Sequence, residues 1–331
     1  MKAFELHNPA TLAAALELLP APRDTKAHGK IKLLAGGQDL LTEMKEHLVE
    51  PDVLVNLKSI PGLDALDFTP DGSVTIGALV PLYALESDMR LPRVVVEAAG
   101  SVASVQIRNQ GTLGGNLCQR PRCWYYRHEQ ALCIKKGGSE CFAYGGLSKY
   151  NAILGGGPSY IVHPSDLAPA LVACGAEAVI ASKKGERKVA LESFFTLPSE
   201  GSVLRENVLA SDEVLTHVRV PALPGAGWRS TYLKFRERSS YDFALASVAL
   251  ALRFEGATIR EARLVLGGVA PIPWRCEKAE KALVGKTIDA DACKLAGALA
   301  LEGAEPLKYN GYKVALAQGL ITKALRKLVN A

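Results

Sequence analysis

Four of the seven cysteines of this chain lie close together, in the stretch NLCQRPRCWYYRHEQALCIKKGGSEC at residues 116–141. Disulfides are not expected there, because the first residues lack the uninterrupted apolar core of an export signal and reducing compartments keep thiols free. Four neighbouring thiolates are typical of iron–sulfur or zinc ligation. The segment is therefore predicted to bind a metal group through Cys118, Cys123, Cys133 and Cys141.

The charges around these cysteines suit an anionic metal cluster. Five cations and two carboxylates in the same segment give 5 − 2 = +3. An iron–sulfur core with four thiolates is negatively charged, so this surplus would offset it. The residues counted are Arg120, Arg122, Arg127, Lys135, Lys136, Glu129 and Glu140. The remaining cysteines, Cys174, Cys276 and Cys293, stand alone in regular segments and are predicted to be buried as small apolar residues.

Two glycine pairs, Gly36-Gly37 and Gly114-Gly115, could hold a phosphate, because glycine lets backbone N–H groups converge on an anion without a Cβ in the way. Each pair alone is more typical of an ordinary turn than of a phosphate site. Neither the dinucleotide fingerprint GxGxxG nor a complete phosphate-binding P-loop occurs, since Glu280 stands where the P-loop requires glycine before Gly285-Lys286-Thr287.

The composition excludes several classes of protein. With 48% hydrophobic and 22% charged residues, the chain is typical of globular proteins rather than disordered ones. The net charge of +5 is spread along the sequence, so nucleic-acid binding is not predicted. The longest apolar run, residues 243–252, is too short to span a membrane. No nucleophile with a neighbouring base stands out, so no catalytic residue is predicted.

Hydrophobic periodicity predicts an α+β protein whose last third is separate from the rest. Pro221, Pro224, Gly225 and Gly227 mark the expected boundary. Strands are predicted at 2–6, 31–35, 53–57, 63–68, 73–76, 177–181, 187–191, 232–236, 247–254 and 258–266. Helices are predicted at 11–19, 40–46, 82–86, 93–99, 165–171, 276–283, 290–301 and 314–329. The cysteine segment has no clear periodicity.

Three motifs together carry a family resemblance. AGGQDL at 35–40, GTLGGN at 111–116 and HPSDLAPAL at 163–171 resemble the flavin-binding signatures of the FAD-binding medium subunit of molybdenum hydroxylases, the xanthine dehydrogenase and carbon monoxide dehydrogenase family. YLKFR at 232–236 and YDFALASVA at 241–249 resemble the second domain of that family. The resemblance covers nearly the whole chain.

The resemblance implies a fold and a division into domains. The fold is α+β, with a two-lobed FAD-binding domain of the vanillyl-alcohol-oxidase type and a C-terminal domain of a three-stranded antiparallel sheet and helices. The expected parts are a first FAD-binding lobe at 1–57, a second lobe at 58–222 with an iron–sulfur insertion at about 117–158, and the C-terminal α+β domain at 228–331.

The resemblance also implies which residues bind FAD. The first glycine loop would hold the diphosphate, the second would line the diphosphate and the isoalloxazine, and Asp166 would contact a ribityl or ribose hydroxyl. Lys234 and Asp242 match positions near the flavin ring or the domain contact, although an exposed pair is an alternative. The implied cofactor-binding residues are Leu34, Ala35, Gly36, Gly37, Gln38, Asp39, Leu40, Gly111, Thr112, Gly114, Gly115, Asn116, Ser165, Asp166 and Lys234.

The cysteine insertion is similar to that of 4-hydroxybenzoyl-CoA reductase and of bacterial aldehyde oxidoreductases whose flavin subunit carries an additional [4Fe–4S] cluster. In those relatives the fourth cluster cysteine lies downstream, where this chain has Gly155 to Tyr160 and no cysteine. Cys118 is therefore expected to supply the fourth thiolate. The alternatives are that Ser159 ligates through its oxygen or that the cluster is incomplete or absent. A zinc site with four thiolates is the competing interpretation of the segment.

The function implied by the resemblance is electron transfer within a heterotrimeric molybdenum-dependent oxidoreductase, of the aldehyde oxidoreductase or xanthine dehydrogenase class. The partners would be a small [2Fe–2S] subunit and a large molybdenum-cofactor subunit, and FAD would deliver electrons to an external acceptor. A stand-alone flavin oxidoreductase and a zinc-stabilised binding module are the alternatives. The expected location is the cytoplasm, or the periplasm if a signal-bearing partner exports the complex.

Overall fold

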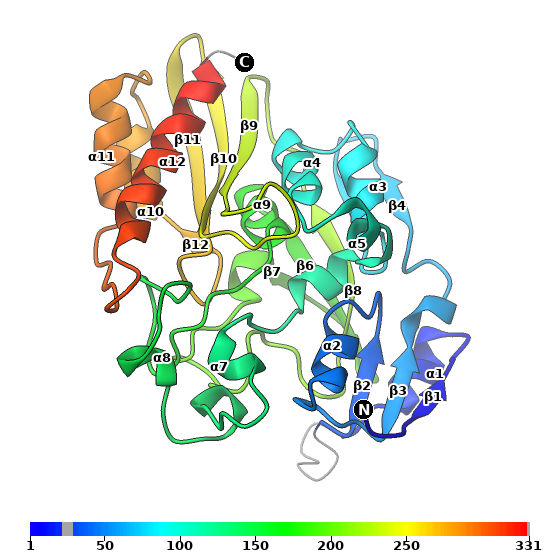
Figure 1. Cartoon of the computed structure of the whole chain (residues 1–331). Coiled ribbons are helices and arrows are strands. Elements are labelled where there is room, and N and C mark those ends of the chain that lie inside the picture. Colours follow the sequence, from blue (N-terminus) through cyan, green and yellow to red (C-terminus); the bar gives the residue numbers. More distant parts are fainter. Residues whose placement is uncertain (22–28, 330–331) are drawn as a thin grey trace.

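A computed structural model describes residues 1–21 and 29–329. The chain forms three β-sheets, each with its own set of helices (Figure 1). The first sheet is parallel and the other two are antiparallel. The α+β class predicted from the sequence is confirmed.

The first sheet is small, and its strands are short. β1 (Glu5–His7), β3 (Val53–Asn56) and β2 (Ile31–Leu34) pair in the order β1-β3-β2. β2 and β3 are mostly apolar, whereas β1 is polar and largely exposed. The helix α1 (Leu12–Glu17) begins where the Thr11 hydroxyl accepts the Ala14 N–H. The helix α2 (Leu40–Lys45) follows β2 directly, so the glycine pair at 36–37 lies in the turn between strand and helix. The 3₁₀ turn η1 (Leu57–Ser59) ends this region.

The second sheet has the order β4-β5-β8-β6-β7. Its strands are β4 (Leu66–Phe68), β5 (Val74–Gly77), β6 (Glu177–Ser182), β7 (Gly185–Ala190) and β8 (Val214–Val220), and the predicted hairpin β6–β7 is confirmed. The largest apolar core lies between this sheet and its helices. These are α3 (Leu82–Ser87), α4 (Arg93–Gly100), α5 (Val105–Gln110), α6 (Leu113–Leu117) and α9 (Leu167–Ala173), with the 3₁₀ turn η3 (Leu191–Ser193).

The cysteine segment leaves this core between α6 and α9 and forms only short helical turns: α7 (Trp124–Arg127), η2 (Ile134–Lys136) and α8 (Phe142–Gly145). In Figure 1 these turns form the green region beside the first sheet. Few residues of this segment join the apolar cores. Its contacts with the rest of the chain are largely hydrogen bonds of charged and polar side chains.

The third sheet has the order β12-β11-β10-β9, formed by β9 (Trp228–Phe235), β10 (Ala246–Glu255), β11 (Thr258–Gly267) and β12 (Trp274–Arg275). The three long strands agree with the predicted antiparallel sheet, and the two-residue strand β12 extends it at one edge. Alternate residues of β10 bury both faces: Val248 and Leu250 contact the core under α10 (Glu277–Leu283), α11 (Ala290–Ala300) and α12 (Tyr312–Val329), whereas Ala249 joins the core with α4 and α9.

A buried lysine fastens the last helix to loops far away in the sequence. The side chain of Lys313 is fully buried, and its Nζ donates to Gly268 O at 2.7 Å and Tyr150 O at 3.0 Å. Burial lowers the pKa of Lys313 to about 7. Nearby, the Asn310 amide donates to Asn151 O and Ala152 O. None of the described helices is long and apolar enough to cross a bilayer.

Candidate functional site

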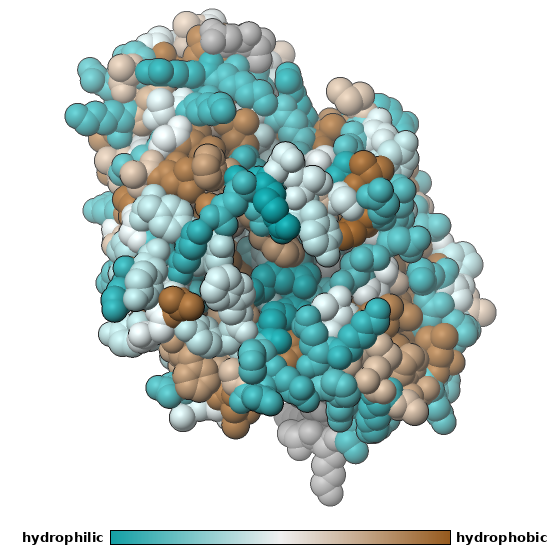
Figure 2. All heavy atoms as spheres, in the orientation of Figure 1, coloured by the Kyte–Doolittle hydropathy of each residue, from teal (hydrophilic) through white to brown (hydrophobic). Residues whose placement is uncertain are grey.

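A cavity of about 480 Å³ lies where the first two sheets and the loop after β9 meet, and we call it the glycine-loop cavity. Figure 2 shows a recess near the middle of this face of the molecule, with mostly hydrophilic residues at its rim. Most of the predicted cofactor-binding residues line the cavity. They are Ala35, Gly36, Gly37, Gln38, Asp39, Leu40, Gly111, Thr112, Gly115, Asn116 and Asp166.

The first glycine loop has the features that a diphosphate requires. Gly37 has φ +72°, which favours glycine, and the turn leads directly into α2. Within the described part of the chain, the backbone N–H groups of Gly36, Gly37 and Gln38 donate to no protein acceptor. Free N–H groups that border a cavity before a helix suit a phosphate, so the loop fits the diphosphate of FAD.

Both glycine motifs contain a glycine that leaves no room for a Cβ. A Cβ at Gly36 would lie 2.1 Å from Gln110 O, and a Cβ at Gly114 would lie 2.9 Å from the Ala78 Cβ. Gly114 thus packs against the end of β5 and does not line the cavity. The expected loop at 111–116 is partly helical, because the Thr112 hydroxyl accepts the Gly115 N–H and starts α6.

The third motif is joined to the second by hydrogen bonds. The Ser165 hydroxyl donates to Asn116 Oδ1 at 2.5 Å and accepts the Ala168 N–H at 2.9 Å, so Ser165 starts α9 as predicted. Ser165 borders a second cavity rather than the glycine-loop cavity. Leu34 ends strand β2 and lines neither cavity.

Asp166 is held by two protein donors. Its oxygens accept from Tyr232 Oη at 2.6 Å and Lys234 Nζ at 2.7 Å, and Lys234 also donates to Ser101 O. The Lys234 side chain is 3% exposed, so the alternative of an exposed pair fails for it. Lys234 does not line the cavity and links the third sheet to the second lobe. Asp166 still borders the cavity, where it could accept a hydroxyl.

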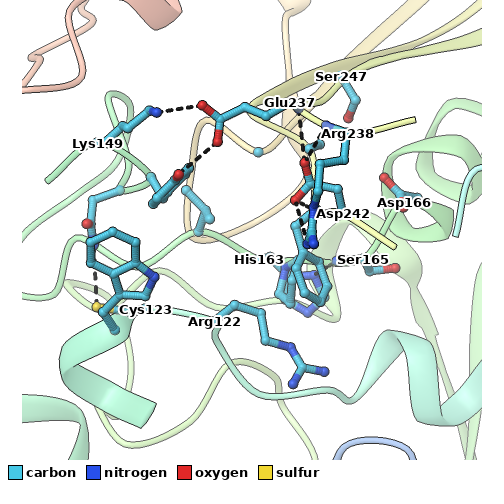
Figure 3. Close-up of a pocket in the computed structure, with 18 of the residues that line it drawn as sticks. Arg122, Cys123, Lys149, His163, Ser165, Asp166, Glu237, Arg238, Asp242 and Ser247 are labelled. Atoms are coloured by element: carbon cyan, nitrogen blue, oxygen red, sulfur yellow. Dashed lines mark hydrogen bonds and ion pairs between the residues drawn. The ribbon is translucent and has the colours of Figure 1, made fainter. Parts of the chain in front are cut away.

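A second cavity of about 360 Å³ adjoins the first, and both are bordered by Arg122, Pro164, Asp166, Arg238, Asp242 and Phe243. In Figure 3, Glu237 faces Lys149 at one end, while Arg238 and Asp242 lie nearer Ser165. Glu237 accepts from Lys149 Nζ at 2.5 Å and from Tyr150 Oη at 2.8 Å. Burial lowers the pKa of His163 in this wall to about 4, so its ring is neutral at physiological pH.

Sequence reasoning missed most of the loop after β9. Arg238, Tyr241 and Phe243 border the glycine-loop cavity, although only Asp242 was singled out beforehand. Asp242 accepts the N–H groups of Glu237 and Arg238 and so shapes this loop. A cluster of Ser, Tyr and Asp between two apolar strands was the available signal.

The four clustered cysteines do not share one environment. Cys118 lies against the largest core and lines the glycine-loop cavity, and burial raises its pKa to about 12. Cys123 lines the second cavity, where burial raises its pKa and the nearby Cys141 thiol adds to the effect. Among the described residues, no three His, Cys, Asp or Glu side chains are placed to hold a metal ion. Cys118 thus borders a different cavity from Cys123, and a shared site of the four thiols stays a prediction.

A backbone hydrogen bond brings Cys133 and Cys141 close together. Ile134 N donates to Glu140 O at 2.8 Å, which places the chain at Cys133 beside the chain at Cys141. The Asn151 amide lies 3.6 Å from the Cys123 sulfur and donates to Tyr160 O. The thiols of these three cysteines suit an iron–sulfur cluster chemically. The isolated cysteines Cys174, Cys276 and Cys293 are buried, as predicted.

The cations of the cysteine segment pair with carboxylates outside it. Asp39 Oδ1 accepts from Arg127 at 2.7 Å and lies 2.9 Å from the Arg122 guanidinium, while Asp39 Oδ2 accepts the Arg120 N–H at 2.6 Å. Lys135 pairs with Glu206 at 2.5 Å, and both side chains are buried. The sequence predicted these cations as counter-charges for a cluster, whereas the structure directs them to the first lobe and to Glu206.

Comparison with known proteins gives the same family for both parts of the chain. Residues 2–223 match the model of the FAD binding domain in molybdopterin dehydrogenase, and residues 230–328 match that of the CO dehydrogenase flavoprotein C-terminal domain. The aldehyde oxidoreductase FAD-binding subunit PaoB of Escherichia coli is 33% identical, over 98% of each chain.

Two further comparisons concern carbon monoxide dehydrogenase of Hydrogenophaga pseudoflava. Its medium chain is 31% identical, over 97% of this chain and 96% of the relative. The solved structure of that enzyme without the Mo-pyranopterin moiety superposes with a TM-score of 0.76 and covers 99% of this chain and 97% of the other. With both family models matched and the fold shared, this chain belongs to the family of FAD-binding medium subunits of molybdenum hydroxylases.

Proposed function

We propose that this chain is the electron-transfer subunit of a molybdenum hydroxylase-type oxidoreductase and holds FAD in the glycine-loop cavity. The observation that carries the proposal is that segments 35–40 and 111–116, together with Asp166, meet at one cavity with free N–H groups. Bound FAD supplies the exchange between one-electron and two-electron transfer. The substrate would be oxidised in a partner subunit.

Flavin binding by a Gly115 variant tests the site. A Cβ at Gly115 would meet only the Thr112 hydroxyl, at 3.0 Å, so Gly115→Val should fill cavity space without disturbing the lobes. We expect the purified wild-type chain to carry FAD and the variant to lose it while keeping its thermal stability. A colourless wild-type chain would contradict the proposal, and full FAD stoichiometry in the variant would remove Gly115 from the site.

We further propose that the cysteine segment holds a [4Fe–4S] cluster through Cys123, Cys133 and Cys141. The structure favours Ser159 over Cys118 as the fourth ligand. Ser159 is 1% exposed, and its hydroxyl has no hydrogen-bond partner among the described residues. It precedes Tyr160, whose carbonyl accepts from the same Asn151 amide that contacts Cys123. A buried, unpaired hydroxyl in the residue before Tyr160 supports an oxygen ligand there.

Metal analysis and EPR distinguish the possibilities. Iron and acid-labile sulfide in the anaerobically purified protein would support the cluster, and zinc alone would support the competing zinc site. In the reduced protein, Cys118→Ala is expected to keep the cluster signal of the wild type and Ser159→Ala to alter it. The opposite pattern would return the fourth position to Cys118.

We also propose that the chain assembles with a small [2Fe–2S] subunit and a large molybdenum-cofactor subunit. The names of the relatives support this, since those of carbon monoxide and glyceraldehyde dehydrogenase are called medium chains. Large apolar side chains on the cysteine segment are exposed, as expected of a surface that a partner covers. They are Trp124, Leu132, Tyr144 and Leu147.

Co-purification from the native host tests this assembly. Two partner chains with molybdenum and additional iron would support it, whereas a flavin-containing chain that purifies alone and reduces an acceptor would support the stand-alone oxidoreductase. We propose an aldehyde as the substrate class, because the match to PaoB covers nearly both chains, and turnover of xanthine but not of aldehydes would contradict this. The compartment would follow that of the partners, either cytoplasm or periplasm.

A further inference from the structure

Two arginines of the cysteine segment lie in the wall of the glycine-loop cavity. Arg120 and Arg122 border it together with Gly36, Gly37 and Asp39. Asp39 anchors both, since one of its oxygens accepts the Arg120 N–H and the other pairs with the Arg122 guanidinium. The cysteine segment thus reaches the turn that is suited to the diphosphate.

These arginines keep donors that no protein group uses. Among the described residues, Arg120 Nε, Arg122 Nε and Arg127 Nη1 are buried without a hydrogen-bond partner. Arg120 Nε is 3.3 Å from a Glu206 oxygen but is not directed at it. Buried donors on a charged group are costly to leave unpaired, so the protein groups around this cluster do not satisfy it fully. Arg120 and Arg122 also border the cavity, so other atoms of these two side chains can meet an anion there.

The charge of the cluster matches such an acceptor. Four cations, Arg120, Arg122, Arg127 and Lys135, face the two carboxylates of Asp39 and Glu206, which gives 4 − 2 = +2. The other charged groups of the cavity balance one another, because Lys32 opposes Glu43, Arg238 opposes Asp242, and Asp166 is paired with Lys234. Each phosphate of a dinucleotide carries a negative charge at neutral pH, so a diphosphate would neutralise the surplus.

The arginine side chains are held in place by aromatic rings. The Arg122 guanidinium lies 5.0 Å from the centre of the Phe243 ring, and those of Arg120 and Arg127 lie 5.1 and 5.5 Å from the centre of the Tyr126 ring. Positions fixed in this way reduce the conformational entropy lost when an anion binds. The cluster is therefore organised before any ligand arrives.

We infer that Arg120 and Arg122, anchored by Asp39, complete the diphosphate site of FAD, and that the cysteine segment is in this way part of the flavin site. The inference rests on the proposed binding of FAD in this cavity. It extends that proposal, because the two glycine loops would then supply only the uncharged half of the diphosphate site. Loss of order in the cysteine segment would release the flavin as well.

Equilibrium binding of FAD to the apo-protein tests the inference. Arg122→Gln keeps a polar side chain but removes the charge, and its FAD Kd is expected to rise roughly 10- to 100-fold, as for a lost charge-assisted hydrogen bond. The Kd of the variant should also depend less steeply on salt than that of the wild type. Arg122→Lys, which keeps the charge, should fall between the two.

A matched control and a second variant keep the test decisive. Arg187 pairs with Glu213 in the same way but borders neither cavity, so Arg187→Gln should bind FAD within twofold of the wild type. If Arg122→Gln does not fold, Arg120→Gln answers the same question. Inorganic pyrophosphate should compete with FAD in the wild type and lose this ability in Arg122→Gln, whereas competition by orthophosphate alone would indicate a free-phosphate site and overturn the inference.

An FAD Kd within twofold of the wild type in both folded glutamine variants would also overturn the inference and leave the arginines a purely structural role. If the wild-type chain itself binds no FAD, the proposed function fails instead. The two failures are thus distinguishable.

Discussion

The two walls of the glycine-loop cavity are held by different forces. On the side of the glycine motifs, backbone contacts backbone: Gly36 meets Gln110, and Gly114 meets Ala78, without room for a Cβ. On the side of the cysteine segment, charged groups meet across the cavity wall, and three guanidinium donors and the Ser159 hydroxyl lack partners among the described residues. The first wall is fixed by steric contact and leaves only backbone N–H groups unpaired, whereas the second is fixed by charge pairs and leaves side-chain groups unpaired.

This difference predicts which positions of the two walls tolerate substitution. A wall fixed by steric contact tolerates almost no change at its glycines, because backbone atoms cannot move apart without separating the lobes. A wall of charge pairs tolerates conservative changes but depends on each partner being present. Substitutions in the two walls should therefore differ in size and in whether a second substitution rescues them.

The largest effect is expected for Gly36→Val. A side chain there would place its Cβ 2.1 Å from Gln110 O, so the lobes cannot close. We expect a loss of more than about 4 kcal/mol in the free energy of unfolding, together with loss of FAD. Urea denaturation measures the former. Gly145→Ala is the control, since nothing lies within 4 Å of a Cβ at that position. Equal stability of the two variants would remove the steric account of this wall.

The next effect concerns the buried pair of Lys135 and Glu206, whose side chains are 1% and 4% exposed. Lys135→Met leaves the buried Glu206 with the more distant Arg120 as its ion-pair partner, and should cost about 3 kcal/mol. Lys278→Met, which breaks an exposed pair with Glu302, should cost less than about 0.5 kcal/mol. If the double variant Lys135→Met/Glu206→Leu is no more stable than Lys135→Met, the second wall does not depend on charge pairing.

The pH dependence of the free energy of unfolding tests the contact of Lys313 with the carbonyls of Tyr150 and Gly268. The pKa of Lys313 is about 7 in the folded chain and near 10.5 when the side chain is exposed. Between these values the unfolded chain binds more protons, so the free energy of unfolding should rise with pH, by at most about 1.4 kcal/mol per unit.

Unfolding of the wild type and Lys313→Met between pH 7 and about 9 measures this slope. Lys313→Met should lack the part of this rise that comes from Lys313. Other groups titrate alike in both proteins, so the difference between the two slopes reports on Lys313 alone. Equal slopes in the two proteins would show that Lys313 stays protonated through its two carbonyl acceptors.

The smallest effect is expected for Tyr126→Phe in the second wall. The Tyr126 hydroxyl donates to Glu43 Oε1 at 2.6 Å, and burial raises the pKa of Glu43 while this hydrogen bond opposes the rise. Loss of the donor should cost about 1–2 kcal/mol in the free energy of unfolding. Tyr83 is exposed, so Tyr83→Phe should change stability by less than about 0.5 kcal/mol. A neutral Tyr126→Phe would mean that water replaces the hydroxyl.

The sequence allowed much of the first wall to be predicted and little of the second. The strands at 31–35 and 247–254 and the hairpin after Glu177 follow from periodicity and turn residues, which are local. The glycine motifs were recognisable because few other residues fit their geometry. The strand β8 was not predicted, although VLTHVRV at 214–220 alternates as a strand does.

The pairing of Asp39 with the arginines of the cysteine segment could not be predicted in the same way. Asp39 and Arg127 are 88 positions apart, and local patterns do not specify which carboxylate a cation will meet. Cys118 and Cys123 are near neighbours in sequence yet border different cavities. Sequence spacing alone does not show which cavity a side chain will border, so the predicted set of four ligands stays a prediction.

The position of Lys313 has a consequence for how the protein is made. Together with Asn310 it holds the backbone at residues 150–152 and at Gly268, which are next to or part of the second cavity wall. Asn310 and Lys313 follow every residue that lines either cavity, so they are translated after the earlier parts of the chain have begun to fold. The wall of the second cavity is thus unbraced on the nascent chain until residues 310–313 have been made.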